Sequence, residues 1–265
     1  MLEKIPLPQP HLRPWALFLD VDGTLLELVD HPDKVRVPEE LPGLLGQLRN
    51  LLGGATALVS GRSLQTLDTL FGLRAFDAAG CHGAEFRLNG KEAPPAADQT
   101  LVARIARRLI EETFGLKNIF VEIKPQSVAL HFRISSVDPA EALLAMERGL
   151  AVAPGEFRIL RGKNVFEAVG CHTGKDIAVA RFLLEEPYFN RTPVFIGDDV
   201  SDEAAFAEVN RRGGLSIRVG ERADSVAQYC IADVKTTSMW LRDWLLPRLC
   251  QMPPIAPQRH YLQMV

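Results

Sequence analysis

The sequence predicts an α/β protein with an open, mostly parallel sheet, helices on both faces of that sheet, and a small inserted α+β domain. In the first and last parts of the chain, short apolar runs that end in small or acidic residues alternate with segments of helical periodicity. The middle of the chain instead alternates between polar and apolar residues. We therefore expect a core formed by residues 1–97 and 170–265, with the insert over residues 98–169.

The core strands are predicted from three short apolar runs, which are residues 15–21, 55–59 and 193–196. Helical periodicity predicts core helices over residues 41–52, 64–71 and 175–184. The sequences Asp-Gly, Ser-Gly-Arg and Gly-Asp-Asp follow the three strands in turn. Ligands of such sheets bind beyond the carboxyl ends of the strands, so residues near positions 20, 60 and 198 should converge in one crevice.

The insert is predicted to have the element order αββαββ. A Pro-containing loop over residues 91–98 precedes it. Its expected helices cover residues 99–114 and 139–150, and its expected strands cover residues 119–124, 127–134, 157–160 and 164–168. An α+β unit of this size would pack on the core as a lid.

Composition favours a soluble globular protein, since 47% of the 265 residues are apolar and 24% are charged. The formal net charge of -3 provides no strong basic field, which argues against a nucleic-acid partner. Prolines and charges interrupt the opening residues and no window is as apolar as a membrane span, so we expect a cytoplasmic protein. The cysteines lack CxxC spacing and are expected to be reduced thiols: Cys81, Cys171, Cys230 and Cys250.

Acidic residues gather at two of the predicted strand ends. Asp20 and Asp22 stand two residues apart at the first, and carboxylates that point the same way repel each other unless a cation compensates. A second cluster follows the third predicted strand and consists of Asp198, Asp199 and Asp202. Oxygen ligands of this kind suit Mg²⁺. An Asx turn or a helix N-cap explains either cluster alone equally well, whereas the two together favour a metal site.

Other residues near these strand ends could bind an anion. The segment Ser-Gly-Arg at positions 60–62 offers a hydroxyl and backbone N–H groups at an expected helix start, although such a tripeptide is weak evidence by itself. Lys175 opens another predicted helix and could bring a positive charge to the same anion, but an isolated lysine there is usually only solvated. Thr24 could cap the turn or bind phosphate, and Gly23 is interpreted as the turn former.

In chain order, the segments DVDGT, SGR, a lysine at a helix start and GDDVSD resemble the four motifs of the haloacid-dehalogenase superfamily of phosphatases. The resemblance implies a Rossmann-like core in which Asp20 attacks phosphorus to form an aspartyl-phosphate, while Asp22 protonates the leaving oxygen and later activates water. The phosphate-binding residues that it implies are Ser60, Lys175 and Thr24. The implied cofactor is Mg²⁺, held by Asp20, the Asp22 backbone carbonyl and Asp198, with Asp199 and Asp202 supporting the site.

The first predicted hairpin of the insert carries polar side chains on one face. Period-two alternation places Ala129 with His131 and Arg133, and it places Glu122 with Lys124 on the preceding strand. Donors and acceptors of these kinds suit the hydroxyl groups of a polyol. The alternative is an ordinary solvent-exposed face of a half-buried sheet, which is the commoner meaning of such a hairpin.

Longer segments resemble the trehalose-6-phosphate phosphatase family over nearly the whole chain: LFLDVDGTLLE, HPDKVRVP, VSGRSLQTLD, AGCHGAEFR, VEIKPQSVALHFR, GKNVFEAVG and RTPVFIGDDVSDEAAFAEVNRRGGLSIRVG. This resemblance implies hydrolysis of trehalose 6-phosphate in trehalose biosynthesis, with the insert closing over the site. The sugar-binding residues that it implies are Arg62, His82, Glu122, Lys124, His131, Arg133 and Glu167. The chain departs from the family pattern at Asp176, where glycine is usual, and at residues 168–170, where a basic residue and proline are usual.

Other sugar phosphatases share the four core motifs, so sucrose phosphate, mannosyl-phosphoglycerate and hexose phosphates are alternative substrates. A phosphomutase would also need a bisphosphate activator and a lid that returns the phosphate. A non-catalytic sugar-phosphate-binding partner of a synthase is disfavoured, because the chain keeps Asp20, Asp22, Lys175 and Asp198. We expect a small-molecule sugar phosphate as the partner, no nucleic acid or membrane, a monomeric state, and functional pairing with a separate trehalose-6-phosphate synthase.

Overall fold

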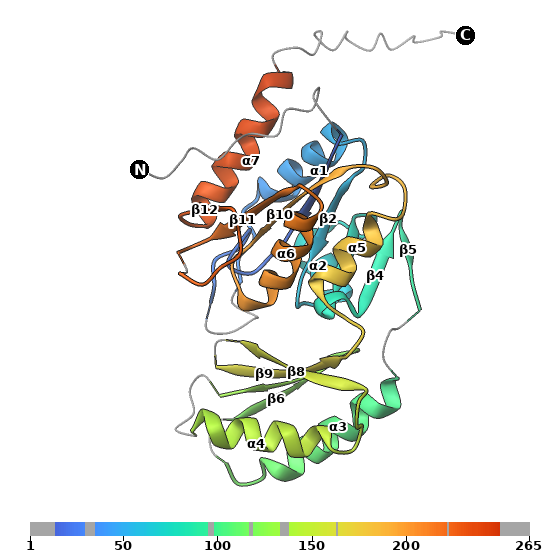
Figure 1. Cartoon of the computed structure of the whole chain (residues 1–265), viewed down its shortest axis with the longest axis vertical. Coiled ribbons are helices and arrows are strands. Elements are labelled where there is room, and N and C mark those ends of the chain that lie inside the picture. Colours follow the sequence, from blue (N-terminus) through green and yellow to red (C-terminus); the bar gives the residue numbers. More distant parts are fainter. Residues whose placement is uncertain are drawn as a thin grey trace, which may run out of the picture.

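The computed structural model describes residues 14–29, 35–94, 98–116, 119–132, 138–162, 164–221 and 223–249. These residues form a larger core and a smaller cap, which lie one above the other in Figure 1. The chain enters the cap after strand β5 and returns to the core at helix α5. Within the described residues, no helix is long and apolar enough to cross a membrane.

An eight-stranded sheet forms the centre of the core. Its strand order is β12-β11-β10-β1-β2-β3-β4-β5, with parallel pairing from β12 to β3 and antiparallel pairing beyond β3. The strands are β1 (Trp15–Leu19), β2 (Thr56–Val59), β3 (Asp77–Gly80), β4 (Glu85–Leu88), β5 (Lys91–Glu92), β10 (Thr192–Gly197), β11 (Leu215–Val219) and β12 (Tyr229–Ile231). The core helices are α1 (Leu41–Leu51), α2 (Leu64–Phe71), α5 (Lys175–Phe182), α6 (Glu203–Arg211) and α7 (Val234–Leu249). The predicted α/β fold class is confirmed.

Helices cover both faces of this sheet, and the central strand β1 is buried on both sides. Its residues Trp15, Leu17 and Leu19 enter a hydrophobic cluster with α1, α2 and α7. Ala16 and Phe18 enter a second cluster with α5 and α6. Since successive side chains of a strand point to opposite faces, a strand covered on both sides must be apolar throughout. The continuous apolar run that predicts β1 is therefore explained by the burial of both of its faces.

The cap is a four-stranded antiparallel sheet with two helices on one face. Its elements are α3 (Gln99–Glu112), β6 (Phe120–Ile123), β7 (Val128–His131), α4 (Pro139–Leu150), β8 (Phe157–Gly162) and β9 (Val165–Gly170). The sheet order is β6-β7-β9-β8. Ile105, Leu130 and Met146 belong to a hydrophobic cluster between the sheet and its helices, which is separate from the clusters of the core. The element order is the αββαββ pattern that the sequence predicts.

The free face of the cap sheet is turned toward the core, while α3 and α4 lie on the far side (Figure 1). Direct contacts join the two parts: the Lys124 ammonium donates to the Gly61 carbonyl over 3.3 Å. The Arg158 guanidinium donates to the Thr173 carbonyl over 2.8 Å. The cap is thus closed on the end of the core where the strands β1, β2 and β10 finish.

Candidate active site

A buried ion cluster lies beyond the ends of β1 and β10. Lys175, the first residue of α5, places its ammonium 2.7 Å from Asp20 Oδ1 and 2.6 Å from Asp202 Oδ1. Only 4% of Lys175 is exposed. Burial alone would lower the pKa of Lys175, but Asp20 and Asp202 raise it above its usual range. Lys175 is therefore held as an ammonium ion, and the purely solvated interpretation of this residue is excluded.

Asp20 stands directly after β1, and hydrogen bonds hold both its backbone and its side chain. Its backbone N–H donates to the Ile196 carbonyl of β10 over 2.9 Å, and the Thr24 hydroxyl donates to Asp20 Oδ2 over 3.1 Å. Its carboxylate is 4% exposed. Burial raises the pKa of Asp20 well above its ordinary value, against the opposing effect of Lys175. In this structure, Thr24 contacts the predicted nucleophile.

Asp198 completes a cluster of three carboxylates. Oxygen atoms of Asp20, Asp198 and Asp202 all lie within 4.8 Å of one another. Burial, and next the neighbouring Asp202, raise the pKa of Asp198 to about 7. Asp198 also lies close to the backbone of Gly23, where a Cβ would be only 2.0 Å from Asp198 Oδ2. The φ of Gly23, +79°, likewise suits glycine.

These residues fit a divalent cation. Three carboxylates face one ammonium, which leaves two negative charges uncompensated if all three are ionised, and buried charges require compensation. The Oδ1 atom of Asp198 is buried without a hydrogen-bond partner among the described residues. An all-oxygen donor set of this kind suits Mg²⁺ better than softer metals. The magnesium identity stays a proposal, whereas the acidic triad that could bind a metal is observed.

Asp202 and Asp199 hold the loop after β10. Asp202 Oδ2 accepts the backbone N–H groups of Asp198 and Asp199, at 3.0 and 2.9 Å. Asp199 is the N-cap of the short 3₁₀ helix η3 (Val200–Asp202), with its side chain accepting the Ser201 N–H. Asp202 thus both binds Lys175 and shapes the loop. For Asp199, the contact observed is the N-cap that the sequence left open as an alternative.

Asp22 has a different surrounding from Asp20. Its carboxylate is 32% exposed and accepts two hydrogen bonds of 2.6 Å from Arg62, one on each oxygen. The pair places Arg62 at the entrance of the site, next to the predicted acid–base residue. Two aspartates two residues apart therefore occupy one buried and one accessible environment, which is the arrangement that separates two acid–base roles.

The segment after β2 differs in detail from the expected anion site. Ser60 is buried and its hydroxyl accepts the Arg62 N–H over 3.1 Å. The helix α2 begins only at Leu64, where the backbone N–H donates to Glu85 Oε2 over 2.6 Å. Ser63 caps the same helix by accepting the Thr66 N–H. Two of the N–H groups at the N-terminus of α2, those of Leu64 and Thr66, are thus already bonded to protein side chains.

On the cap, Glu167 of β9 connects three other side chains. Its oxygens accept hydrogen bonds from the Lys124 ammonium at 2.9 and 3.0 Å, and the Ser127 hydroxyl lies 2.5 Å from Oε1. His82 Nε2 of the core lies 3.2 Å from Oε2. Burial alone would raise the pKa of Glu167, but Lys124 and His82 lower it well below its ordinary value. This carboxylate is therefore ionised and joins cap to core.

The neighbouring pair His131 and Glu122 lies on the same face of the cap sheet. His131 Nε2 is 2.8 Å from Glu122 Oε2, and this hydrogen bond lowers the pKa of Glu122. Strand register places Glu122 beside Ala129 and Ala129 beside Glu167, so all these side chains share the face turned toward the core. Arg133, predicted to join them, lies outside the described residues.

A cleft of about 610 Å³ separates this face from the strand ends of the core. Its polar lining includes Asp22, Arg62, Glu122, Lys124, His131 and Glu167. Leu28, Val35, Leu70 and Ile123 add an apolar wall. The volume lies within the roughly 300–1,000 Å³ usual for small-molecule sites. Glu122, Lys124, His131 and Glu167, which the sequence associates with sugar binding, thus meet in one cavity.

Some contacts of the site were not among the predicted residues. Ser127 is buried against Glu167, and the period-two alternation that selected His131 also contains Ser127. Arg158 joins the cap to the loop before Lys175, and nothing in its local sequence distinguishes it from a surface arginine. His82 was predicted, but its left-handed backbone, with φ of 55°, was not.

Comparison with known proteins finds similar sequences over most of the chain. A sequence model of the family described as trehalose-phosphatase matches residues 18–234. A probable trehalose-phosphate phosphatase of Sinorhizobium fredii is 44% identical over 206 residues, which are 78% of this chain and 78% of that protein. The trehalose-6-phosphate phosphatase of Escherichia coli is 37% identical over 228 residues, covering 86% of this chain and 85% of that protein.

Solved structures show the same fold. The C-terminal domain of the Candida albicans trehalose-6-phosphate phosphatase superposes with a TM-score of 0.76 at 18% identity, covering 89% of this chain and 93% of that chain. A phosphatase of the haloalkanoate (HAD) superfamily from Bacteroides thetaiotaomicron gives a TM-score of 0.59 at 15% identity, covering 91% and 99%. The core has the fold of haloacid-dehalogenase phosphatases, and the family model with the named relatives shows that the chain is a phosphoric monoester hydrolase. Within that class, the chain belongs to the trehalose-phosphatase family.

Proposed function

We propose that the protein hydrolyses trehalose 6-phosphate to trehalose and phosphate, with Mg²⁺ as cofactor and Asp20 as the nucleophile. The observation that carries this proposal is that Asp22, two residues after the Asp20 that binds Lys175, lines a cleft whose opposite wall is the polar face of the cap. The Asp20–Lys175 cluster suits a phosphoryl group and the cap suits the hydroxyl groups of a sugar. Membership in the trehalose-phosphatase family supports this substrate.

In the first step, an oxygen of Asp20 forms a bond to phosphorus as the bond from phosphorus to the sugar oxygen breaks. Asp22 gives its proton to that departing oxygen. In the second step, Asp22 takes a proton from water, which attacks the aspartyl-phosphate and restores Asp20. Lys175 and Ser60 stabilise the negative charge of the transferring group, and their burial strengthens that interaction.

Asp22 must leave Arg62 before it can donate a proton. In the structure, both carboxylate oxygens of Asp22 accept hydrogen bonds from Arg62. A guanidinium binds phosphate and carboxylate with the same forked geometry. An incoming sugar phosphate therefore offers Arg62 an alternative anionic partner, which would release Asp22.

The metal would be held by Asp20 and Asp198, with the Asp22 backbone carbonyl as a further oxygen ligand. When bound, Mg²⁺ neutralises charge between the phosphate and the nucleophile. Two observations support this assignment: Asp198 Oδ1 is buried without a hydrogen-bond partner among the described residues, and three carboxylates lie together beside one ammonium.

The sugar would be recognised by Arg62, Glu122, Lys124, His131 and Glu167, which line the cleft. His82, which contacts Glu167, and Arg133, which lies outside the described residues, are the other proposed sugar-binding residues. Ammonium and imidazole groups donate to sugar hydroxyls while the carboxylates accept from them. His82 of the core contacts Glu167 of the cap. A substrate bound between core and cap would therefore favour the closed cap and exclude water from the site. A cytoplasmic location, a monomeric state and pairing with a separate synthase stay predictions from the sequence.

The direct test is Asp20→Asn, assayed as Mg²⁺-dependent phosphate release from trehalose 6-phosphate. We expect turnover to fall by roughly three orders of magnitude or more, as for other nucleophile replacements. Asp98→Asn is the matched control, because Asp98 is the exposed N-cap of α3 and asparagine caps a helix equally well. Retained hydrolysis in a folded Asp20→Asn variant would remove Asp20 as the nucleophile.

A further inference from the structure

We propose that Arg218 is a positioning residue that holds the metal ligand Asp198 and thereby increases the affinity of the site for Mg²⁺. The inference rests on the proposed function, since it assumes that Asp198 binds the metal. Arg218 belongs to β11 and pairs in register with Gly197, the residue before Asp198 on β10. Only 8% of it is exposed.

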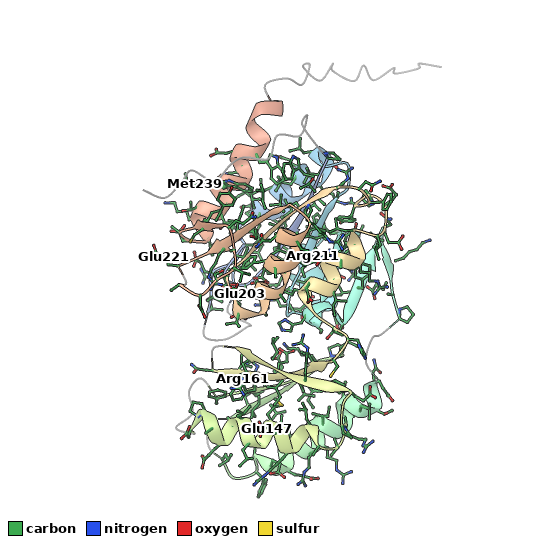
Figure 2. The ribbon with its side chains drawn as sticks, viewed as in Figure 1. Glu147, Arg161, Glu203, Arg211, Glu221 and Met239 are labelled. Carbon is green, nitrogen blue, oxygen red and sulfur yellow. The ribbon has the colours of Figure 1, made fainter. Side chains whose placement is uncertain are left out.

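The two arms of the Arg218 guanidinium have different partners. One arm forms an ion pair with Glu203 Oε1 over 2.9 Å. The other donates to the backbone carbonyl of Asp198. The second oxygen of Glu203 accepts the Val226 N–H over 2.9 Å, so Glu203 is itself fixed. Glu203 begins α6 on the side of the core that faces the cap, as Figure 2 shows.

Asp198 depends on this contact more than the other carboxylates of the cluster. Asp20 and Asp202 both bind the Lys175 ammonium directly, whereas no ion pair joins Asp198 to a cation among the described residues. The Asp198 backbone is held at its N–H by Asp202 and at its carbonyl by Arg218. Because Asp198 Oδ1 has no hydrogen-bond partner among the described residues, the position of this carboxylate depends strongly on how its backbone is held.

Arg218 could affect Mg²⁺ affinity through its charge or through its hold on Asp198, and the two effects have opposite signs. A positive guanidinium near a cation site repels the cation, so removal of the charge alone would strengthen Mg²⁺ binding. If Arg218 instead orients Asp198, its removal weakens binding, since groups that orient metal ligands typically change metal affinity 10–100-fold. The sign of the change therefore distinguishes the two effects.

The test is isothermal titration of Mg²⁺ into the full-length metal-free protein and its variants. We expect Arg218→Met to weaken Mg²⁺ binding by about tenfold or more. Arg212→Met is the matched control, because Arg212, the C-cap of α6, pairs with Glu208, and no hydrogen bond or ion pair joins it to Asp198 among the described residues. Its Mg²⁺ affinity should equal that of the unchanged protein.

Unchanged or tighter Mg²⁺ binding by folded Arg218→Met would overturn the inference and leave the proposed function intact. Absence of Mg²⁺ binding by the unchanged protein would overturn the proposed metal site, and this inference with it. If Arg218→Met does not fold, Arg218→Lys provides the same test. Its single ammonium keeps the charge but lacks the fork that reaches both Glu203 and the Asp198 carbonyl, so Mg²⁺ binding should again weaken, and unchanged binding would contradict the inference.

Discussion

At the scale of single residues, the active site concentrates charge where water is largely excluded. The carboxylate cluster has only Lys175 as a buried counterion among the described residues. Such an arrangement lowers the stability of the metal-free fold, because each ionised carboxylate loses hydration and repels its neighbours. We expect the carboxylate cluster to be kept because it serves catalysis. The repulsion between its carboxylates should make the free energy of unfolding depend on bound metal and on pH.

Replacement of Asp198 by asparagine should stabilise the metal-free protein at pH 8 by about 0.5–2 kcal/mol. Burial and Asp202 raise the pKa of Asp198 to about 7 in the folded protein, above the roughly 3.9 of an unfolded aspartate. The folded state therefore binds this proton more tightly, and stability is lost as the pH rises from about 4 through about 7.

Thermal unfolding in EDTA at pH 5 and pH 8 measures this effect. The unchanged protein should lose stability relative to Asp198→Asn between the two pH values, and added Mg²⁺ should remove the advantage of the variant. Parallel pH profiles for the two proteins would show that Asp198 carries no raised pKa.

At the scale of elements, the three core strands predicted from the sequence are buried on both faces. Their apolar runs are continuous, so β1, β2 and β10 could be placed within a few residues. The strand β3 lacks such a run because it begins with Asp77, whose burial depends on the Tyr188 hydroxyl and the Asn89 N–H, both distant in sequence. The exposed two-residue β5 has no hydrophobic pattern at all.

The loop η2 (Cys81–Gly83) packs against the start of α5, and Gly83→Ala tests its role. Gly83 has a φ of +92°, and a Cβ there would lie 2.5 Å from the Gly174 carbonyl oxygen, directly before Lys175. We expect a loss of more than about 2 kcal/mol in the free energy of unfolding, since backbone strain of about 1–2 kcal/mol adds to a backbone collision. Lower kcat should accompany it because Lys175 is displaced.

The matched control is Gly72→Ala, at the C-cap of α2. Gly72 has a φ of +66°, but a Cβ there would meet no atom within 4 Å. Gly72→Ala should therefore lose only the unfolding free energy that corresponds to backbone strain, since no collision adds to it. Its kcat should be unchanged. Equal effects of the two substitutions in urea unfolding and in kcat would contradict the proposed packing of η2 on α5.

At the scale of the whole molecule, contacts between cap and core join the face that we propose binds sugar to the part of the core that we propose binds phosphate. Strand ends and period-two alternation predict some of these residues, such as Asp22 and Lys124, whereas His82 and Glu167 were implied only by the resemblance to the family. Their pairing could not be predicted, because Asp22 and Arg62 are 40 positions apart and His82 and Glu167 are 85 apart. The first pair depends on how β1 and β2 lie side by side, and the second depends on how the cap packs on the core. Local sequence patterns encode neither arrangement.

Removal of the central cap carboxylate should open the cap. Glu167→Ala breaks the contacts to Lys124, Ser127 and His82, so we expect a larger radius of gyration by small-angle X-ray scattering. Glu147→Ala is the control, because Glu147 lies on α4, on the side of the cap away from the core (Figure 2). An unchanged radius for Glu167→Ala would mean that other contacts, such as Arg158 to Thr173, keep the cap closed.

The central claim is that Asp20 acts on the phosphate of a disaccharide held by the cap. The most direct measurement compares kcat/KM for Mg²⁺-dependent phosphate release from trehalose 6-phosphate, sucrose 6-phosphate and glucose 6-phosphate. We predict that trehalose 6-phosphate is preferred over glucose 6-phosphate by at least about 100-fold, because polar groups of the cleft lose their partners when the second sugar ring is absent. An equal or higher kcat/KM for sucrose 6-phosphate or glucose 6-phosphate would contradict the assignment of trehalose 6-phosphate as substrate.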